Sequence, residues 1–499
     1  MPVDREKRGT CAVVGGGLAG LSAALELATA GRRVDVFEQR RALGGRAASR
    51  VEPATGATID LCQHLAMGCC TEWLAFCARL GLANHLCRST GFQFIDPRGR
   101  RHDVAPSTRL PPPWHLLPAL ARLRFLSLRE RVGVARAVAR LARNLLGNLP
   151  NDPPNESRDG PPGEASSETI GHWLARQGQT PRAIEFFWKP ILLSALGETL
   201  DRASLTLARK VFVEGMLASV EAGALWIPTI PLEWLFDRLA GKALEKLGVR
   251  LHRGVKVVAI EGDRCAARRL TLADGRPLEF DAFVVAVPWF QAARLLAGEL
   301  RAAVGDSPGW SRLPGVPITA VHLWYDRPPT ELAHAVLLGR IGQWWFQPPW
   351  AGGASAAGRV GGGDQPDGAP IPHKPPRDDT RSTIASTEAA GYYGQVVVSA
   401  SRALLELPTA EVARLIVDEL AEVWPGASTA RLLRASVVTH RRAVFSTAPR
   451  CDALRPPQRT AVSNLVLAGD WTATGWPATM EGAVRAGRLA ATVLLDTSR

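Results

Sequence analysis

The stretch from Cys11 to Glu38, CAVVGGGLAGLSAALELATAGRRVDVFE, constrains the fold of the whole 499-residue chain. Its apolar start predicts a short buried strand, the next glycines predict a turn, and an apolar repeat of helical period follows. A second strand, Arg33–Phe37, ends at the acid Glu38, which is placed to accept hydrogen bonds from a ribose diol. This order predicts a nucleotide-binding βαβ unit in an α/β protein.

Each glycine of the turn has its own task. Gly15 allows a tight turn, Gly17 lets the backbone approach a pyrophosphate, and Gly20 lets the helix pack closely on the strand. The helix begins at Leu18 and Ala19, where unpaired N–H groups and the positive end of the helix dipole favour phosphate. We therefore expect these five residues to bind the nucleotide.

A second glycine turn, RRALGGRA, follows the βαβ unit. Gly44 and Gly45 precede Arg46, and a planar guanidinium suits a bound pyrophosphate. Further along, the strand Gly254–Ile260 contributes Val257 to the candidate cofactor site.

The far end of the chain separates the candidate cofactors. An apolar strand ends at Gly469-Asp470, and a helix of small residues begins at Met480-Glu481-Gly482. A nicotinamide cofactor needs neither feature, whereas the ribityl chain and ring of a flavin extend beyond the pyrophosphate. Asp470 can accept from a ribityl hydroxyl, and the Met480 helix can aim N–H groups at the flavin pyrimidine edge. We therefore predict FAD.

Composition excludes several other classes of protein. No apolar run approaches the roughly 20 residues of a bilayer-spanning helix, and the polar start MPVDREKRGT lacks a signal peptide, so we expect a cytoplasmic protein. The eight cysteines lack paired C-x-x-C spacing, which predicts buried thiols and no metal site. The net charge of +13 comes with no nucleic-acid motif, so we expect no nucleic-acid partner.

The two ends of the chain carry a resemblance to a known family. GGGLAGLSAALELATAG with VFEQRRALGGRA, and the late stretch LVLAGDWTATGWPATMEGAVRAG, resemble the flavin amine oxidase and phytoene desaturase superfamily. Within it, IDLCQHLAMGCCTEW, AVHLWYDRP with GRIGQWWFQ, and HRRAVFSTAP are similar to the hydroxysqualene dehydroxylases. These usually have Asp-Asn-Gly-Gln-His where this chain has Asp60-Leu-Cys62-Gln-His64, so Cys62 adds a side chain beside the expected flavin ring.

The resemblance implies two discontinuous domains. A Rossmann-like FAD-binding domain of the glutathione-reductase type is expected from residues 8–84, 228–288 and 452–499. An α+β substrate domain of the amine oxidase and phytoene desaturase type is expected from residues 85–227 and 289–451. Its first part is predicted to be mostly helical, including a helix over Pro118–Leu146, and its second part to hold a sheet with strands at Thr319–Tyr325 and Gln395–Ala400. Residues 148–167 and 351–390 are rich in Gly, Pro and Ser, and we expect disordered loops there.

The resemblance also implies an activity, the reduction of hydroxysqualene to squalene by reduced FAD on the route to hopanoids. His64 is the candidate proton donor, with a structural histidine as the alternative. Gln63, Trp345, Phe346 and Trp476 are candidates for the substrate cavity, and Trp476 is also a catalytic candidate because an aromatic face can stabilise a cation. Core packing is the alternative for these aromatic residues.

A C30 isoprenoid substrate implies exchange with a membrane, since placing it in water would cost on the order of 20 kcal/mol. We therefore expect peripheral contact with anionic lipid on the inner face of the cell membrane. The arginine-rich segment Leu120–Leu146 is the candidate for docking, and a solvated helix face is the alternative. Homo-oligomerisation stays open.

Three other functions stay open at this point. A carotenoid-type desaturase would pass hydride from the polyene to oxidised FAD. An amine oxidase commonly uses a lysine near the flavin, and neither Lys189 nor Lys256 is obviously placed for that. A flavoprotein fold kept as a non-enzymatic scaffold is the third.

Overall fold

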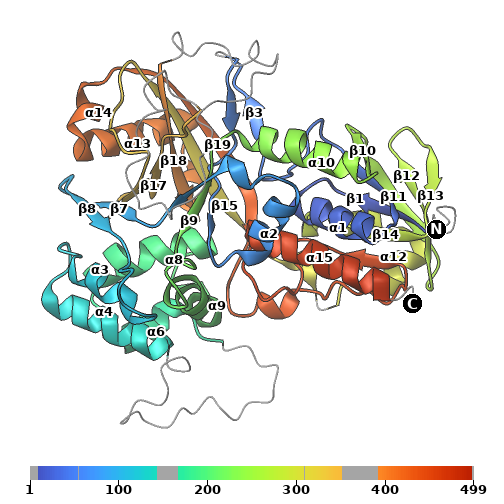
Figure 1. Cartoon of the computed structure of the whole chain (residues 1–499), viewed down its shortest axis with the longest axis horizontal. Helices are drawn as coiled ribbons and strands as arrows, with labels where there is room; N and C mark the ends of the chain where they lie inside the picture. The colour runs from blue at the N-terminus through green and yellow to red at the C-terminus, as the bar shows by residue number, and fades with distance from the viewer. Residues whose placement is uncertain (1–8, 54–55, 143–166, 308, 351–390, 497–499) are drawn as a thin grey trace.

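A computed structural model describes residues 9–53, 56–142, 167–307, 309–350 and 391–496. The expected loops 148–167 and 351–390 lie outside the described residues, apart from Ser167. The described chain forms two units, each built on its own sheet. In Figure 1 a parallel sheet with long helices lies on the right, and a larger sheet with a helical lobe lies on the left.

The first unit is built on five parallel strands in the order β10-β2-β1-β14-β20. All five come from the three segments expected to form the FAD-binding domain. Their buried Val, Leu and Phe side chains are typical of a parallel sheet covered on both faces. The strands are β1 (Thr10–Val14), β2 (Arg33–Glu38), β10 (Arg250–Arg253), β14 (Ala282–Val285) and β20 (Leu465–Leu467).

The first and last helices of the chain pack together on one face of this sheet (Figure 1). They are α1 (Leu18–Thr29) and α15 (Met480–Asp496). A Cβ on Gly487 would lie closer than 3.0 Å to the carbonyl oxygen of Ala19, so only glycine allows this approach. The Ser22 hydroxyl also donates to the Val484 carbonyl oxygen at 2.8 Å.

A small antiparallel sheet contributes to a second apolar cluster, which packs on the face of the parallel sheet opposite to α1 and α15. It consists of β11 (Val257–Gly262), β12 (Ala267–Leu272) and β13 (Pro277–Glu279). Before these strands, residues Glu233–Ala240 and α10 (Gly241–Lys246) form one continuous helical stretch. Two further helices lie between β14 and the second unit, α11 (Trp289–Leu295) and α12 (Gly298–Val304).

The second unit contains a seven-stranded sheet in the order β19-β15-β18-β17-β16-β7-β8. The expected strands at 319–325 and 395–400 are present, although both are longer and begin earlier. The seven strands are β7 (Phe92–Ile95), β8 (Arg101–Val104), β15 (Gly315–Tyr325), β16 (His334–Leu337), β17 (Trp344–Phe346), β18 (Tyr392–Ser399) and β19 (Leu432–Phe445). One face is covered by α13 (Thr409–Val423), and α14 (Pro425–Thr429) follows.

The block from 85 to 227 is not purely helical. Its start supplies β7 and β8 to the large sheet, and two short antiparallel sheets join the units. These are β3 (Ser49–Val51) with β4 (Thr58–Asp60), and β5 (Ala66–Met67) with β9 (Leu225–Pro228) and β6 (Leu86–Ser89). Helix α2 (Thr71–Arg79) follows β5.

The helical lobe is built from several short helices, and the segment expected to be mostly helical over Pro118–Leu146 is helical within the described residues but is broken between Ala121 and Leu128. The chain forms α3 (Leu117–Ala121), breaks, and begins again at Ser127, whose hydroxyl and Glu130 make a capping box. The other helices of the lobe are α4 (Leu128–Leu141), α6 (Ile170–Arg176), α7 (Pro181–Ala183), α8 (Lys189–Leu196) and α9 (Leu205–Lys210).

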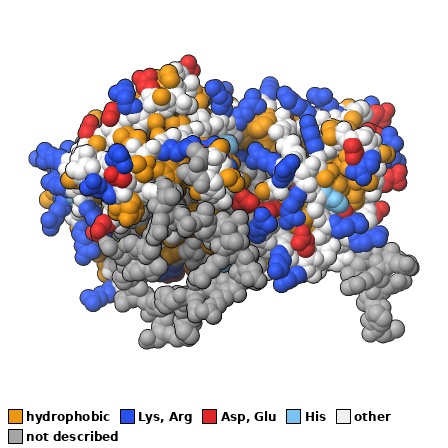
Figure 2. All heavy atoms as spheres, turned by 90° about the horizontal axis from the view of Figure 1, so that it is seen from above, with side chains coloured by type: hydrophobic (Ala, Val, Ile, Leu, Met, Phe, Trp, Pro, Cys, Tyr) orange, Lys and Arg blue, Asp and Glu red, His pale blue; other side chains and the backbone are white. Residues whose placement is uncertain are grey.

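Basic side chains are spread over the surface. Figure 2 shows Lys and Arg over both units on the face seen from above, so on that face the net charge of +13 is not gathered in one patch. Among the described residues, no helix has both the length and the apolarity that a bilayer span requires.

Candidate active site

The first glycine turn has no room for side chains. Gly15 has a φ of +114°, and a Cβ there would lie closer than 3.0 Å to the Ala286 carbonyl oxygen. A Cβ on Gly20 would be equally close to the Gly15 carbonyl oxygen. The turn between β1 and α1 therefore requires glycine at both positions.

The second glycine turn lies against the first. The Gly44 N–H donates to the Gly16 carbonyl oxygen at 2.8 Å, and Gly44 and Gly45 have φ values of +102° and +65°. A Cβ on Gly17 would meet nothing nearer than the Gly45 Cα, at 3.8 Å. The start of α1 at Leu18 and Ala19 thus faces an open backbone cradle of the kind that a pyrophosphate fills.

Glu38 is buried where β2 ends and holds the same turn together. Its carboxylate accepts from the Gly16 N–H at 2.8 Å and from the Arg40 N–H at 2.9 Å. A carboxylate can accept about four hydrogen bonds, so Glu38 retains capacity for a ribose diol. The acid therefore fits the role expected from its spacing.

The two distant halves of the cofactor motif meet in an ion pair. Arg46 donates to the buried carboxylate of Asp470 at 2.6 Å, and to the Ala443 carbonyl oxygen at 2.8 Å. Gly469 has a φ of +154°, and its Cα lies so near the Trp471 indole that a Cβ would approach within 3.0 Å. Arg46 and Asp470, 424 residues apart, thus belong to one site.

Three other candidate cofactor residues are placed less directly. Glu481 is fully buried, and its carboxylate accepts from the Trp73 N–H at 2.8 Å at the start of α2. Burial raises the pKa of Glu481. Its side chain holds α2, so its backbone is what remains for a cofactor. Gly482 packs against the Pro477 carbonyl oxygen, beside the buried Met480.

Val257 lies at the start of β11, with Leu272 as its partner in β12. Its side chain is part of the apolar cluster beside the parallel sheet. The Val257 side chain therefore lies in the core. The backbone just before it lies next to β2, because the Val255 N–H donates to the Glu38 carbonyl oxygen at 2.9 Å.

The segment from Asp60 to His64 is fastened to the large sheet by Gln395. The Gln395 amide accepts from the Gln63 N–H and donates to the Asp60 carbonyl oxygen at 3.3 Å. On its other side, the amide nitrogen lies 3.1 Å from His322 Nδ1 and 3.2 Å from the Tyr393 hydroxyl. One buried side chain of β18 thus links the two units of the protein.

The carboxyl group of Asp60 is buried beneath this segment. One oxygen accepts from the Ser49 hydroxyl at 2.6 Å and from the Leu232 N–H at 2.9 Å, and the other is buried without a partner among the described residues. Burial raises the pKa of Asp60 to about 7, against the opposing effect of these hydrogen bonds. Burial also keeps His322 neutral, because it lowers the pKa of that imidazole to about 3.

His64 makes one defined hydrogen bond, from Nδ1 to the Cys62 carbonyl oxygen at 2.7 Å. A carbonyl only accepts, so Nδ1 carries a hydrogen, and Nε2 of the neutral ring is an acceptor. Burial lowers the pKa of His64, and the nearby charges of Arg46 and His440 act in the same direction. His64 is therefore neutral near pH 7, which weakens the expectation that it donates a proton there.

The large sheet separates the two aromatic cavity candidates. Trp345 packs on Trp424 with ring centroids 5.5 Å apart, in the core beneath α13. Its indole N–H donates to the Leu332 carbonyl oxygen at 3.1 Å. Successive side chains of a strand point to opposite faces, and Phe346 lies on the other face, stacked on Trp344 at 5.5 Å. Trp345 is thus a core residue and is no longer a candidate for the substrate cavity, whereas Phe346 remains one.

Trp476 already has protein cations beside its ring. Lys210 Nζ lies 4.7 Å and Arg485 Cζ 5.6 Å from the ring centroid. Trp476 is buried in the same core cluster as α1 and α15. The π system that was expected to stabilise a substrate cation therefore already interacts with two side chains of the protein.

Three residues of this region were missed from the sequence. His322, Tyr393 and Gln395 lie on central strands, and all three are buried. Phe346, Gln395 and His322 are partners across β17, β18 and β15, so they form one row on one face of the sheet. The signal in the sequence was a polar side chain inside an apolar strand, because burying a polar group costs free energy unless it makes hydrogen bonds.

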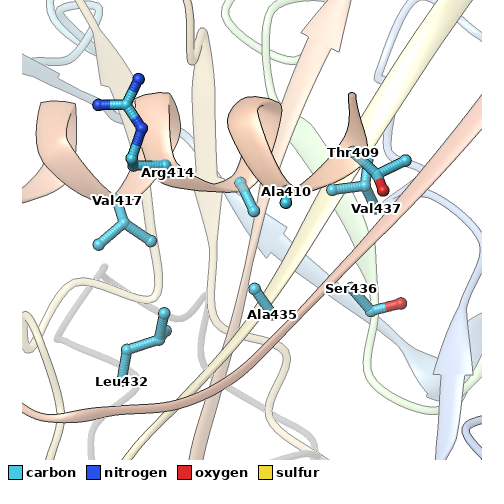
Figure 3. Close-up of a pocket in the computed structure, with 9 residues that line it drawn as sticks. Thr409, Ala410, Arg414, Val417, Leu432, Ala435, Ser436 and Val437 are labelled. Carbon is cyan, nitrogen blue, oxygen red and sulfur yellow. The ribbon is translucent and has the colours of Figure 1, made fainter. Parts of the chain in front are cut away.

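A groove elsewhere lacks comparable chemistry. It lies between α13 and β19 and encloses roughly 670 Å³ (Figure 3). Its lining is mostly small or aliphatic, and Arg414 is the one charged side chain in it. Within the described ranges no three side chains form a metal-binding cluster, and the eight cysteines are free thiols.

Solved structures share this two-unit architecture. Cyclohexylamine oxidase from Brevibacterium oxydans matches with a TM-score of 0.62 at 19% identity, over 99% of this chain and 100% of that one. A putrescine oxidase bound to putrescine matches with a TM-score of 0.62 at 16% identity, over 98% and 99%. An oxidoreductase from Methanosarcina mazei reaches 0.67 at 15% identity, over 98% and 100%.

The backbone cradle at the glycine turns, the carboxylate of Glu38 and the Arg46–Asp470 pair define an FAD-dependent oxidoreductase with a separate substrate domain. A family model described as flavin containing amine oxidoreductase matches residues 18–495. The chain belongs to that family, and its cofactor is FAD.

Similar curated proteins include enzymes acting on isoprenoids. Hydroxysqualene dehydroxylase of Rhodopseudomonas palustris is 28% identical, over 98% of this chain and 99% of the relative. The Sinorhizobium fredii protein of the same name is 27% identical, over 97% and 98%. A 15-cis-phytoene desaturase from an Oncidium hybrid cultivar is 26% identical, over 97% of this chain and 77% of the relative.

Proposed function

We propose that this oxidoreductase reduces hydroxysqualene to squalene. The observation that carries the proposal is similarity along the full length of both proteins to two hydroxysqualene dehydroxylases. Identity alone does not separate them from the desaturases, since 26% is close to 28%. Shared length favours the dehydroxylases, because this chain covers 98–99% of their length and 77% of the length of the phytoene desaturase.

The sheet face beside the Asp60–His64 segment supports an apolar substrate. In the paired strands, Ala320, Trp324 and Val397 lie on the same face as Gln395 and Phe346. His322 and Tyr393 lie on the same face, and apart from these two and Gln395 the side chains named here are apolar. A hydrocarbon needs only apolar walls and an orienting group.

The reaction replaces an allylic hydroxyl by hydrogen. The C–O bond breaks, the hydroxyl leaves as water after gaining a proton, and the same carbon receives a hydride. When bound, reduced FAD supplies that hydride. The protein would orient the alcohol, exclude water and deliver the proton, and His64 is proposed for the last task because its Nε2 is the free nitrogen of the ring.

The lowered pKa of His64 gives this assignment a definite pH signature. Since burial holds the pKa below its usual 6.5, the fraction of protonated His64 rises only as pH falls below that value. Turnover by wild type should therefore increase as pH falls and level off in the acid range. His64→Ala should lose this limb, measured by squalene formation from pH 5 to 8 at about equal flavin content. A His64→Ala profile that matches wild type would contradict the assignment.

Anaerobic single turnover tests the activity itself. Photoreduced protein is mixed with hydroxysqualene, flavin absorbance is followed, and products are identified by mass spectrometry. We expect flavin reoxidation with an equal amount of squalene. Reoxidation without squalene, or neither change, would overturn the proposal.

A carotenoid-type desaturase is the second candidate, favoured by matches to phytoene and zeta-carotene desaturases at 25–26% identity over 96–97% of this chain. Here the hydride would leave the polyene and reduce oxidised FAD. Anaerobic oxidised protein bleached by phytoene, with no turnover of hydroxysqualene, would establish it.

A further inference from the structure

Large apolar side chains are exposed together at one end of the helical lobe. Eleven large hydrophobic residues are exposed among those described, and five of them fall between positions 110 and 132. We call these five the apolar cap: Leu110, Trp114, Leu117, Leu128 and Val132, with exposed fractions of 39%, 52%, 46%, 72% and 41%. Such clustering on a soluble surface marks an interaction site.

The fold holds the apolar cap in place. His115, fully buried, is 3.1 Å from the Met216 carbonyl oxygen through Nε2 and so anchors the loop that carries Trp114. Helices α3 and α4 lie together at the lower left of Figure 1. Arg131 donates to the Ala121 carbonyl oxygen at 2.6 Å and thereby ties the start of α4 to the end of α3.

Helix α4 has two distinct faces. Val134, Ala137 and Leu141 are buried against the lobe, whereas Leu128 and Val132, one turn apart, point outward. A helix whose apolar residues lie only in the core would leave polar residues at these two positions. The exposed face is therefore not explained by the packing of the described residues.

The segment that carries the apolar cap is rich in arginine. Residues 105–142 contain seven arginines and one acid, Glu130. That acid is occupied, because it caps α4 and accepts from the Thr180 hydroxyl at 2.7 Å. Within the described ranges, no acidic side chain pairs with the exposed arginines of this segment, which are Arg109, Arg122, Arg124, Arg129, Arg136 and Arg140.

We propose that the apolar cap inserts shallowly into an anionic bilayer, with the arginines of the same segment on lipid phosphates. Exposed Trp and Leu beside arginine match the order of a membrane interface, in which the acyl boundary lies just below an anionic headgroup layer. The docking surface thus differs from the segment 120–146 expected from the sequence. Its inserted part is limited to the five residues of the apolar cap, and it includes the loop before α3. This inference does not depend on which isoprenoid is the substrate.

Vesicle flotation of the FAD-loaded protein tests the proposal. Wild type should float with phosphatidylglycerol-containing vesicles at low salt, float less at high salt, and stay behind with pure phosphatidylcholine. Leu117→Gln with Leu128→Gln should lower the bound fraction about tenfold, and Arg122→Gln with Arg129→Gln should do so at low salt.

Matched controls separate docking from a general loss of apolar or basic surface. Leu247→Gln with Val258→Gln removes two exposed apolar residues, at 49% and 40%, from the FAD-binding unit. Arg264→Gln with Arg301→Gln removes two exposed arginines outside the helical lobe. Both should float like wild type, with flavin content unchanged in all four variants.

Three outcomes would overturn the inference. The first is that wild type is not recovered with anionic vesicles, and the second is that the cap variants float like wild type. The third is light scattering that shows self-association of wild type and its loss in the cap variants. The last result would make the apolar cap an interface between copies of the chain.

Discussion

The backbone cradle at the glycine turns and the hydrogen-bond network around Gln395 are both buried, yet they are built differently. The cradle is made of backbone, and its key residues are adjacent in sequence or repeat at short spacings. The Gln395 network joins side chains of β15 and β18 to backbone groups of Asp60 and Gln63, which lie more than 300 residues from Gln395 in sequence. The first is therefore encoded locally, and the second exists only in the folded protein.

This difference predicts how each region responds to substitution. A backbone site is lost when a single atom is added, because backbone cannot move aside cheaply. A side-chain network loses function in steps, because each member has its own partners and its own cost when they are left unpaired.

The largest effect is expected at Gly20. Gly20→Ala places a Cβ on the Gly15 carbonyl oxygen and should lower the free energy of unfolding by about 3 kcal/mol or more, with loss of bound FAD. Flavin-to-protein absorbance and urea unfolding measure both. Gly133→Ala in α4 is the control, since its Cβ would meet nothing nearer than 3.6 Å and helix propensity favours alanine. Full flavin content in Gly20→Ala would show that the cradle tolerates movement.

Gln395→Leu should separate flavin binding from turnover. It leaves the Gln63 N–H and the Asp60 carbonyl oxygen without their partner, at a cost of about 2–3 kcal/mol. FAD should remain bound while turnover falls, because the Asp60–His64 segment loses its anchor. Gln343→Leu removes a similar amide that exchanges two hydrogen bonds with Ser399, away from that segment, and should keep its turnover. Equal turnover in the two variants would argue against a positioning role for Gln395.

Asp60→Asn should change the pH dependence of stability. The folded pKa of about 7 exceeds the unfolded value near 3.8, so the stability that Asp60 contributes is complete below about pH 4 and is lost as pH rises towards 7. Over that window the free energy of unfolding of wild type should fall relative to that of Asp60→Asn, whose side chain does not titrate, as measured by urea unfolding.

Asp96→Asn provides a control of opposite sign. Burial raises the pKa of Asp96, but hydrogen bonds from His102 and Arg100 outweigh it and leave the pKa lowered. Its contribution is therefore present above about pH 4 and lost as pH falls further. If both variants shifted the profile in the same direction, the linkage argument for Asp60 would fail.

The smallest effect is expected for the Arg46–Asp470 pair. Arg46 is about one-third exposed, so a double-mutant cycle with Arg46→Met and Asp470→Asn should give a coupling energy of about 1 kcal/mol. The exposed pair Arg101–Asp103, 2.7 Å apart, should give less than about 0.5 kcal/mol. Equal couplings would mean that burial of Asp470 adds nothing.

The sequence predicts well what depends on local geometry. Gly15 allows the tight turn and Gly20 the close helix packing that their spacing indicates, and Glu38 is buried against the same turn, while its bond to a ribose stays a prediction. Asp470 was predicted from its strand and turn, although its partner Arg46 could not be inferred from spacing.

Predictions that depended on tertiary contacts were less complete. Trp345 and Phe346 are neighbours in sequence, and only the strand register shows that they face opposite sides of the sheet. The break between α3 and α4 was signalled by Ser127 and Glu130, but the apolar repeat around them also fits one long helix. Glu481 was placed near the cofactor by sequence, whereas its carboxylate caps a helix 408 residues away.

The packing of α1 on α15 has a consequence for synthesis of the protein. Gly487 meets Ala19 only after the more than 400 residues between them have been synthesised, so the face of the nucleotide unit beneath α15 stays uncovered until then. Contacts of such long range also slow folding. We therefore expect nascent chains to need a chaperone until α15 docks, and flavin capture to be a post-translational event.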